Sequence, residues 1–360
     1  MKKLISMAAV LTAGAMVLAG CGTSAPSPSP DANAAAGSAA DTESAAKTGL
    51  GVVTSIARSA NAKAGTDGAA HADSTIAAVT VDSTGKIVKC VLDTAEPTVS
   101  FNASGAITSD KTTEQLSNRE IPDAGIKNVS SIGKGWTEQA DAFAAWAVGK
   151  SAADVQNLKV KQTDSESGVP DSPDLTSSVT ISVSSFQDAI SKAVTNAAQP
   201  DPSFPAGSKS GLGVFSDISR STDAANGKDG AGAISNYIAW VTVDDSGKIL
   251  ACKLDAVEAT VNFSASGAVT SDKTRQLASQ QGATTDGMKA ASSIGKGWKD
   301  QADAFAVWAV GKTSADVTNL KVKQVGTESG VPDSPDLTSS VTMSVSPFMN
   351  AIAKAIANAK

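Results

Sequence analysis

Histidine is almost missing from this chain, which has one, His71, in 360 residues. A single histidine excludes a metal site built from several histidines, and the second half of the chain has none for acid–base catalysis. Aromatic residues make up 4% of the sequence and charged residues 18%, but the apolar share of 41% lets each half bury a modest core. The net charge of −6 argues against nucleic acid as a partner, because a nucleic-acid binder would show a basic stripe.

The N-terminus contains the strongest targeting signal. Two lysines precede an apolar run over 4–18, and a lipobox of sequence LAGC ends at Cys21. The run is too short, and too close to small residues, to be a spanning helix. The pattern resembles a bacterial lipoprotein signal. We therefore expect residues 1–20 to be a signal peptide and Cys21 to carry the lipid that anchors the chain on the extracellular face of the cytoplasmic membrane.

The mature chain is expected to begin with a tether and to continue as a duplication. Residues 21–48 contain almost no large apolar side chain, so they cannot bury enough surface to fold and are expected to be a flexible, disordered tether. From Gly49 the sequence repeats with a fixed offset of 162 residues. This period predicts two tandem homologous domains, 49–198 and 211–360, with a Pro-rich linker over 199–210.

Each repeat reads as strands first and helices afterwards. In the first repeat, β-branched runs over 74–81 and 86–92 flank a turn sequence and predict a hairpin, and 98–101 with 106–108 predict a second pair. These signals favour an α+β fold in which each domain is a small antiparallel sheet packed with helices.

Three helices are expected in the second part of the repeat. An apolar stripe that includes Trp136 and Phe143 predicts one helix, which Gly149 ends. A capping box at 151–154 predicts a second, short helix, and the segment from Val160 onward reads as loop. The third helix is expected over 186–197, with Ser184 or Ser185 as its cap.

A ten-residue polar run, DSPDLTSSVT, occurs without change at 171–180 and at 333–342. It ends a few residues before the N-cap of the third helix, whose exposed N–H groups favour an anionic phosphate nearby. Each copy contains Asp-x-x-Ser-Ser-Val-Thr, which is similar to the acceptor motif Asp-x-x-(Ser/Thr)-Gly-Ala-(Thr/Ser) of covalently flavinylated proteins. That resemblance implies that a flavin transferase joins FMN through a phosphoester to Thr180 and to Thr342. The other site residues that it implies are Asp174, Ser177 and Ser178 in the first copy and Asp336, Ser339 and Ser340 in the second.

The whole repeat resembles the domain of the flavin-bearing surface lipoproteins of Gram-positive extracellular electron transfer, also known as pheromone-encoding lipoproteins. The resemblance implies two covalent FMN groups that take electrons from a membrane NADH dehydrogenase through the quinone pool and pass them to extracellular flavins or ferric iron. Such a chain is a redox carrier rather than a conventional enzyme. The alternative is a cofactor-free surface lipoprotein, either a binding or adhesion module or a pheromone precursor. The matching stretches are 49–55, 82–88, 132–136, 146–150 and 169–180, each repeated 162 residues later.

Several other residues allow two interpretations. Trp136 and Trp146 are core anchors of a helix or side chains that flank a flavin ring. Lys134 and its counterpart Lys296 are exposed loop lysines or partners of a phosphate.

Cysteine and glycine patterns give weaker indications. Cys90 and Cys252, one in each repeat, are expected to be small core residues of a strand rather than a disulfide. The Gly-x-Gly that begins at Gly49 lacks the third glycine and the βαβ setting of a dinucleotide fingerprint. A hydrolase is disfavoured, because neither repeat offers a Ser–His–Asp set or a metal cluster.

Overall fold

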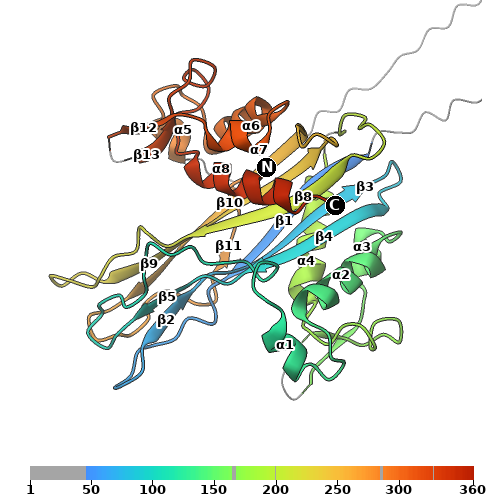
Figure 1. Ribbon diagram of the computed structural model, residues 1–360. Coiled ribbons are helices and arrows are strands. Elements are labelled where there is room, and N and C mark those ends of the chain that lie inside the picture. Colours follow the sequence, from blue (N-terminus) through green and yellow to red (C-terminus); the bar gives the residue numbers. More distant parts are fainter. Residues whose placement is uncertain (1–45, 164–167, 199, 284–286, 327) are drawn as a thin grey trace, which may run out of the picture. The chain divides into compact units, whose positions relative to one another are not determined.

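Two antiparallel sheets form the frame of the computed structural model (Figure 1), which describes residues 46–163, 168–198, 200–283, 287–326 and 328–360. One sheet has the strand order β11-β1-β3-β4 and the other β10-β9-β8. Three smaller two-stranded sheets accompany them, and helices pack against both large sheets. The predicted α+β class with small antiparallel sheets and helices is confirmed. The signal peptide and Cys21 lie outside the described residues.

The elements recur in the same order in the two repeats. In the first repeat they are β1 (Lys47–Ser55), β2 (Gly68–His71), β3 (Asp73–Val81), β4 (Ile87–Ala95), β5 (Thr98–Phe101), α1 (Ala124–Val129), α2 (Trp136–Ala147), α3 (Ala152–Gln156), β6 (Val160–Lys161), β7 (Val169–Pro170) and α4 (Ser184–Asn196). In the second they are β8 (Lys209–Asp217), β9 (Gly230–Val243), β10 (Ile249–Phe263), β11 (Gln276–Leu277), α5 (Gly287–Ala291), α6 (Trp298–Ala309), α7 (Ser314–Thr318), β12 (Val322–Val325), β13 (Glu328–Pro332) and α8 (Ser346–Ala357).

The long hairpin of the second repeat is divided in the first. β9 and β10 pair without a break at Ile234 and Ala259, whereas the equivalent ladder stops between β2 and β3 and between β4 and β5. Pro97 stands where the second repeat has Ala259. Proline has no backbone N–H to donate to a ladder, so the pairing is interrupted at this position.

The predicted hairpin over 74–92 is confirmed as β3 and β4. Its turn is closed by Asp82, whose Oδ1 accepts the backbone N–H of Thr84 at 2.8 Å and of Lys86 at 3.0 Å, and Gly85 supplies the positive φ of 78°. The second predicted pair is present as a bridge between Phe101 and Ile107. The main partner of β5 is β2, which the sequence did not reveal.

The predicted helices are present, with two corrections. α2 covers the expected stripe, and Ser151 with Asp154 forms the predicted capping box of α3. α4 begins at Ser184 rather than 186, and its cap is Val183 with no side-chain bond, so the serine cap was wrong. The N–H of Val183 instead donates to the carbonyl of Gly168. The predicted loop after Val160 also contains the short pair β6 and β7.

Glycine lets α4 lie directly on β1, and α8 on β8 (Figure 1). A Cβ added at Gly49 would lie 2.0 Å from the carbonyl oxygen of Ala193, and one at Gly51 would lie 2.0 Å from that of Ala189. The second repeat has the same close approach at Gly211 and Gly213. The Gly-x-Gly therefore has a packing role, because only glycine allows a strand and a helix backbone to approach so closely.

The two repeats share one hydrophobic core. The rings of Phe101 and Phe263 stack with their centroids 3.9 Å apart, inside a cluster of buried residues drawn from both repeats. Strand pairing also crosses between repeats, because β11 pairs with β1, and Gln115 forms a bridge with Ser216. Contacts of this kind unite Ser44–Lys360 as one compact unit.

Polar contacts add to this junction. The side-chain amide of Asn236 donates to the hydroxyl of Ser74 at 2.8 Å, and both residues are buried. Lys354 of α8 pairs with Glu114 and Glu120 of the first repeat. The segment between the repeats also contacts the second repeat, because the carboxylate of Asp201 is buried and lies 3.3 Å from Lys253 Nζ. None of the helices in the described part of the chain has the length and apolar character that crossing a bilayer requires.

Replacing Gly51 with alanine is expected to lower the free energy of unfolding by about 3 kcal/mol, because the new methyl group would force α4 away from β1. Urea denaturation of the folded chain measures the change. Gly287→Ala is the control, since that exposed position has no atom within 4 Å of the added Cβ. An equal, small effect of the two substitutions would contradict the packing role.

Candidate functional site

The run at 171–180 folds as two successive turns in front of α4. The carbonyl of Ser172 accepts the N–H of Leu175 at 3.0 Å, and the carbonyl of Leu175 accepts the N–H of Val179 at 2.8 Å. Leu175 and Val179 are buried in the core, so the turns are fixed at two points. The run at 333–342 has the same bonds, with Leu337 and Val341 buried in turn. Identical local sequence thus gives the same loop geometry twice.

The predicted site residues do not gather at one point. Thr180 and Thr342 are half-buried at the end of each loop. Ser178 and Ser340 are also half-buried, and each hydroxyl donates to the carbonyl of the leucine three residues before it, at 3.1 and 3.2 Å. Exposed on the outer side of the loops are Asp174, Ser177, Asp336 and Ser339.

A buried glutamine contacts each of the two threonines that the motif predicts as acceptors. Gln139, on the inner face of α2, is 0% exposed. Its Oε1 accepts the N–H of Thr180 at 2.7 Å, the hydroxyl of Thr180 at 3.1 Å and the N–H of Ile181 at 3.2 Å. Gln301 makes the same three bonds to Thr342 and Met343, at 2.8, 3.2 and 3.1 Å.

Our sequence prediction missed these glutamines. The available signal was a polar residue on the apolar stripe of the helix between Trp136 and Phe143, at the same place in both repeats. A buried amide at such a position needs hydrogen-bond partners inside the fold.

A hollow of about 480 Å³ lies next to Thr180. Its wall is mainly apolar and includes Ile126 and Val129 of α1 together with Val169 and Ile181. Val129 is 83% exposed, so a large apolar side chain faces solvent at the rim. Lys161 is the lysine in this wall, and its Nζ lies 3.2 Å from the carboxylate of Asp171.

A second hollow, of about 540 Å³, lies next to Thr342. Met288 and Ala291 of α5 take the places of Ile126 and Val129. Both volumes fall within the roughly 300–1,000 Å³ that is typical of small-molecule sites. Each hollow therefore has room for a flat heterocycle beside a threonine hydroxyl.

The two hollows differ in their other walls. Tyr237, whose counterpart in the first repeat is Thr75, lines the second hollow together with Trp298 and Arg220. The guanidinium of Arg220 lies 2.9 Å from the carboxylate of Glu258. Burial raises the pKa of Tyr237, so its phenol is neutral at physiological pH.

The tryptophans predicted as core anchors take part in packing. Trp136 is 7% exposed and lies 6.1 Å from Phe186 between ring centroids. Trp146 is half-buried, stacks on Phe143 at 5.4 Å, and carries the ammonium of Lys150 at 4.5 Å above its ring. In the second repeat Trp298 both lines the hollow beside Thr342 and packs against Phe348, with the ring centroids 5.9 Å apart.

Neither of the two lysines considered as phosphate partners is among the described residues that line the hollows. The backbone carbonyl of Lys134 instead accepts the amide of Gln139 at 2.9 Å, and that of Lys296 accepts the amide of Gln301 at 2.9 Å. Cys90 lies in β4 and is a free thiol at the edge of the core, where burial raises its pKa to about 12. That pKa makes it a weak nucleophile at neutral pH.

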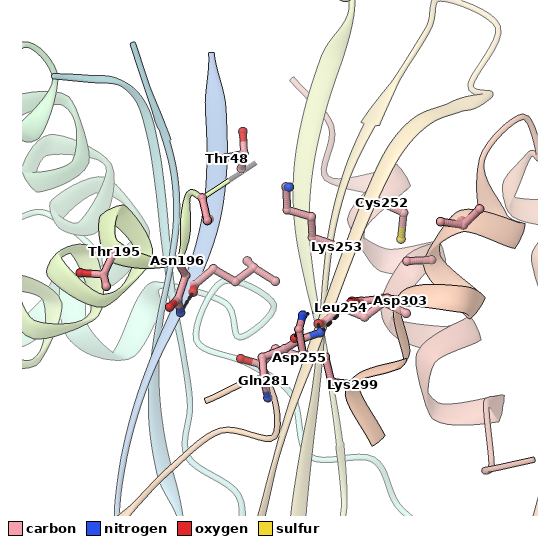
Figure 2. Close-up of a pocket in the computed structure, with 15 residues that line it drawn as sticks. Thr48, Thr195, Asn196, Cys252, Lys253, Leu254, Asp255, Gln281, Lys299 and Asp303 are labelled. Carbon is pink, nitrogen blue, oxygen red and sulfur yellow. Dashed lines mark hydrogen bonds and ion pairs between the residues drawn. The ribbon is translucent and has the colours of Figure 1, made fainter. Parts of the chain in front are cut away.

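A third hollow, of about 550 Å³, separates β1 and α4 from β10 and α6 (Figure 2). Lys299 Nζ in its wall lies 2.7 Å from Gln281 Oε1 and 3.0 Å from Asp303 Oδ2. Asp255 lies at its base and is 1% exposed. Neither acceptor threonine is among the described residues that line it.

Burial strongly affects two equivalent carboxyls, Asp93 and Asp255. Loss of solvation raises the pKa of each to about 6, although backbone N–H groups partly compensate. Asp255 Oδ1 accepts the N–H of Gln281 at 3.0 Å, and Asp93 accepts that of Arg119 at 3.2 Å. Each carboxyl thereby fastens the long connection that follows the strand.

Within the described ranges, no group of three or more histidine, cysteine or carboxylate side chains is placed to hold a metal ion. Comparisons with protein-family models, with curated proteins and with solved structures gave no match for this chain. The assignment of a function therefore depends on the acceptor motif and the geometry around it.

Asp255→Asn is expected to change the pH dependence of stability. The folded-state pKa of about 6 exceeds the usual value near 3.9, so the folded chain holds a proton that the unfolded chain has lost. The free energy of unfolding of the wild type therefore falls as pH rises from about 4 to 6. Above pH 6 the Asp255 carboxyl is ionised in the folded chain too, and the stability lost in this range is not regained. Relative to wild type, the variant should gain stability from pH 4 to pH 7, by about 2 kcal/mol.

Urea unfolding at several pH values between 4 and 7 measures this difference. The exposed Asp245→Asn serves as the control, because its carboxyl lies at a hairpin turn. A difference between Asp255→Asn and wild type that stays constant with pH would contradict the assignment.

Proposed function

We propose that this chain is a lipid-anchored surface flavoprotein that carries FMN covalently on Thr180 and Thr342. It relays electrons from a membrane NADH dehydrogenase and the quinone pool to extracellular acceptors such as free flavins or ferric iron. One observation carries the proposal. An identical acceptor run ends, in both repeats, at a half-buried threonine hydroxyl that borders a hollow of suitable size.

The residues present fit a phosphoester-linked flavin. Each threonine lines its hollow, and the apolar wall beside Thr180 suits a flat ring system. Lys161 and Arg220 place one cation in each wall, and each would have to exchange its present carboxylate partner, Asp171 or Glu258, for the phosphate. Bound FMN supplies electron transfer at its ring, while the chain's part is to hold the phosphate and leave a ring edge open to solvent.

The duplication supports the same reading. We infer that the repeats are two homologous domains, because the strand and helix order and the acceptor geometry recur at a constant offset. Their common core favours a fixed arrangement of two carriers on one body. Cys21 would hold that body at the outer face of the membrane through its lipid, with the segment up to residue 48 as the tether.

The test is the mass and colour of chain produced with a flavin transferase. We expect flavin absorbance and two FMN units, one fewer in Thr180→Ala or Thr342→Ala, and none in the double variant. Thr338→Ala is the matched control, because Thr338 is an exposed threonine in the same polar run. It should keep both groups.

Colourless wild-type chain of unmodified mass would overturn the proposal. The cofactor-free surface lipoprotein would then be the better description.

A further inference from the structure

Gln139 and Gln301 are neutral amides in places where the fold otherwise buries apolar groups. Both are 0% exposed. Burying an amide is unfavourable unless it is hydrogen-bonded, and each of these amides is bonded at both ends. The oxygen accepts three donors from the acceptor loop, and the nitrogen donates to the carbonyl of the loop before the helix, at Lys134 or Lys296. The glutamine thus connects two loops through one side chain.

The orientation of the amide follows from its partners. Two backbone N–H groups, of Thr180 and Ile181, can only donate, so the atom that meets them must be the oxygen Oε1. The same oxygen then accepts the Thr180 hydroxyl at 3.1 Å. A hydroxyl has one proton and two lone pairs, so a proton directed at Gln139 leaves the lone pairs free to face elsewhere.

We propose that Gln139 and Gln301 are positioning residues that present the threonine oxygen for flavin attachment; this inference rests on the proposed function. In that step Thr180 Oγ1 attacks the FMN phosphorus of an activated donor with a phosphoanhydride bond, such as FAD. The Oγ1–P bond forms, the P–O bond to AMP breaks, AMP leaves with the electron pair, and the hydroxyl proton passes to a base of the transferase. An amide cannot accept that proton at neutral pH, so its role is orientation.

The contact also persists after attachment. The phosphoester removes the hydroxyl proton, but the two backbone N–H donors still reach Gln139 Oε1. The loop therefore keeps one geometry before and after modification, and the second repeat, with Gln301, does the same.

The two repeats provide an internal control. Full-length Gln139→Leu is produced with a flavin transferase and FAD, and the modified fraction of the Thr180 and Thr342 peptides is followed over time by mass spectrometry. We expect the rate at Thr180 to fall at least about tenfold and the rate at Thr342 to stay at the wild-type level. Gln301→Leu should reverse the pattern.

Gln187→Met is the matched control for lost stability. Gln187 is also buried in the first repeat, but its side-chain amide donates to the carbonyls of Val155 and Leu158, at 2.9 and 3.0 Å, rather than bonding to Thr180. The second repeat has Met349 at the same place, so the fold accepts methionine there. Thr180 should be modified normally in this variant.

Conservative variants separate orientation from simple packing. Gln139→Glu keeps an acceptor oxygen at the same reach but loses the N–H that donates to Lys134, so it should restore part of the rate at Thr180, whereas the shorter Gln139→Asn should restore none. Wild-type rates at Thr180 in Gln139→Leu, or equal losses in Gln139→Leu and Gln187→Met, would overturn the inference and leave the proposed function intact. Wild-type chain that stays unmodified at both threonines would instead overturn the proposed function itself.

Discussion

The arrangement of the two repeats depends on a shared hydrophobic core, and the stacked rings of Phe101 and Phe263 lie within it. Each ring is fully buried, and each belongs to a strand of a different repeat. Around them the apolar side chains of β1, β3, β8, β9 and β10 form one cluster, so burying the inner face of one sheet requires the other. Because this core is shared, packing between the repeats, rather than the linker, fixes their relative position.

The outer faces of the two sheets bury separate helix layers. α4 lies on β1 in the first repeat and α8 on β8 in the second, each at a distance that Gly51 or Gly213 makes possible. The acceptor loops precede these helices, and the glutamines of α2 and α6 reach them from the same layer. The position of each threonine is thus set by helix–sheet packing within its own repeat, and the relation between the threonines by the shared core.

Sequence patterns predicted the local structure well. The turn at Asp82, the stripe of α2 and the capping box at Ser151 depend on neighbours in the chain, so residue type and spacing are sufficient to find them. The serine cap of α4 was wrong because the helix already begins at Ser184, which leaves Val183, a residue without a polar side chain, at the cap position.

The parts that sequence did not reveal depend on contacts between distant segments. A repeat shows that two units fold alike, but it does not show that β11 pairs with β1 of the other unit. The candidate site was found only in part for the same reason. The acceptor run is contiguous and therefore visible, whereas Gln139 lies 41 residues before Thr180 and the walls of the hollow come from α1 and β7.

The duplicated frame and the differing walls have different consequences for the proposed carriers. Each threonine is bonded to an equivalent glutamine in the same geometry, which would make attachment at the two sites chemically equivalent. The surroundings are not equivalent, because Tyr237 and Met288 stand in the second repeat where Thr75 and Ile126 stand in the first. A flavin's potential responds to aromatic stacking and to nearby charge, so two attached flavins would differ in potential although their attachment is the same. Under the proposed function, a duplication that preserves the loop at 171–180 and 333–342 letter for letter, while its surroundings diverge, would give electrons a preferred direction along one chain.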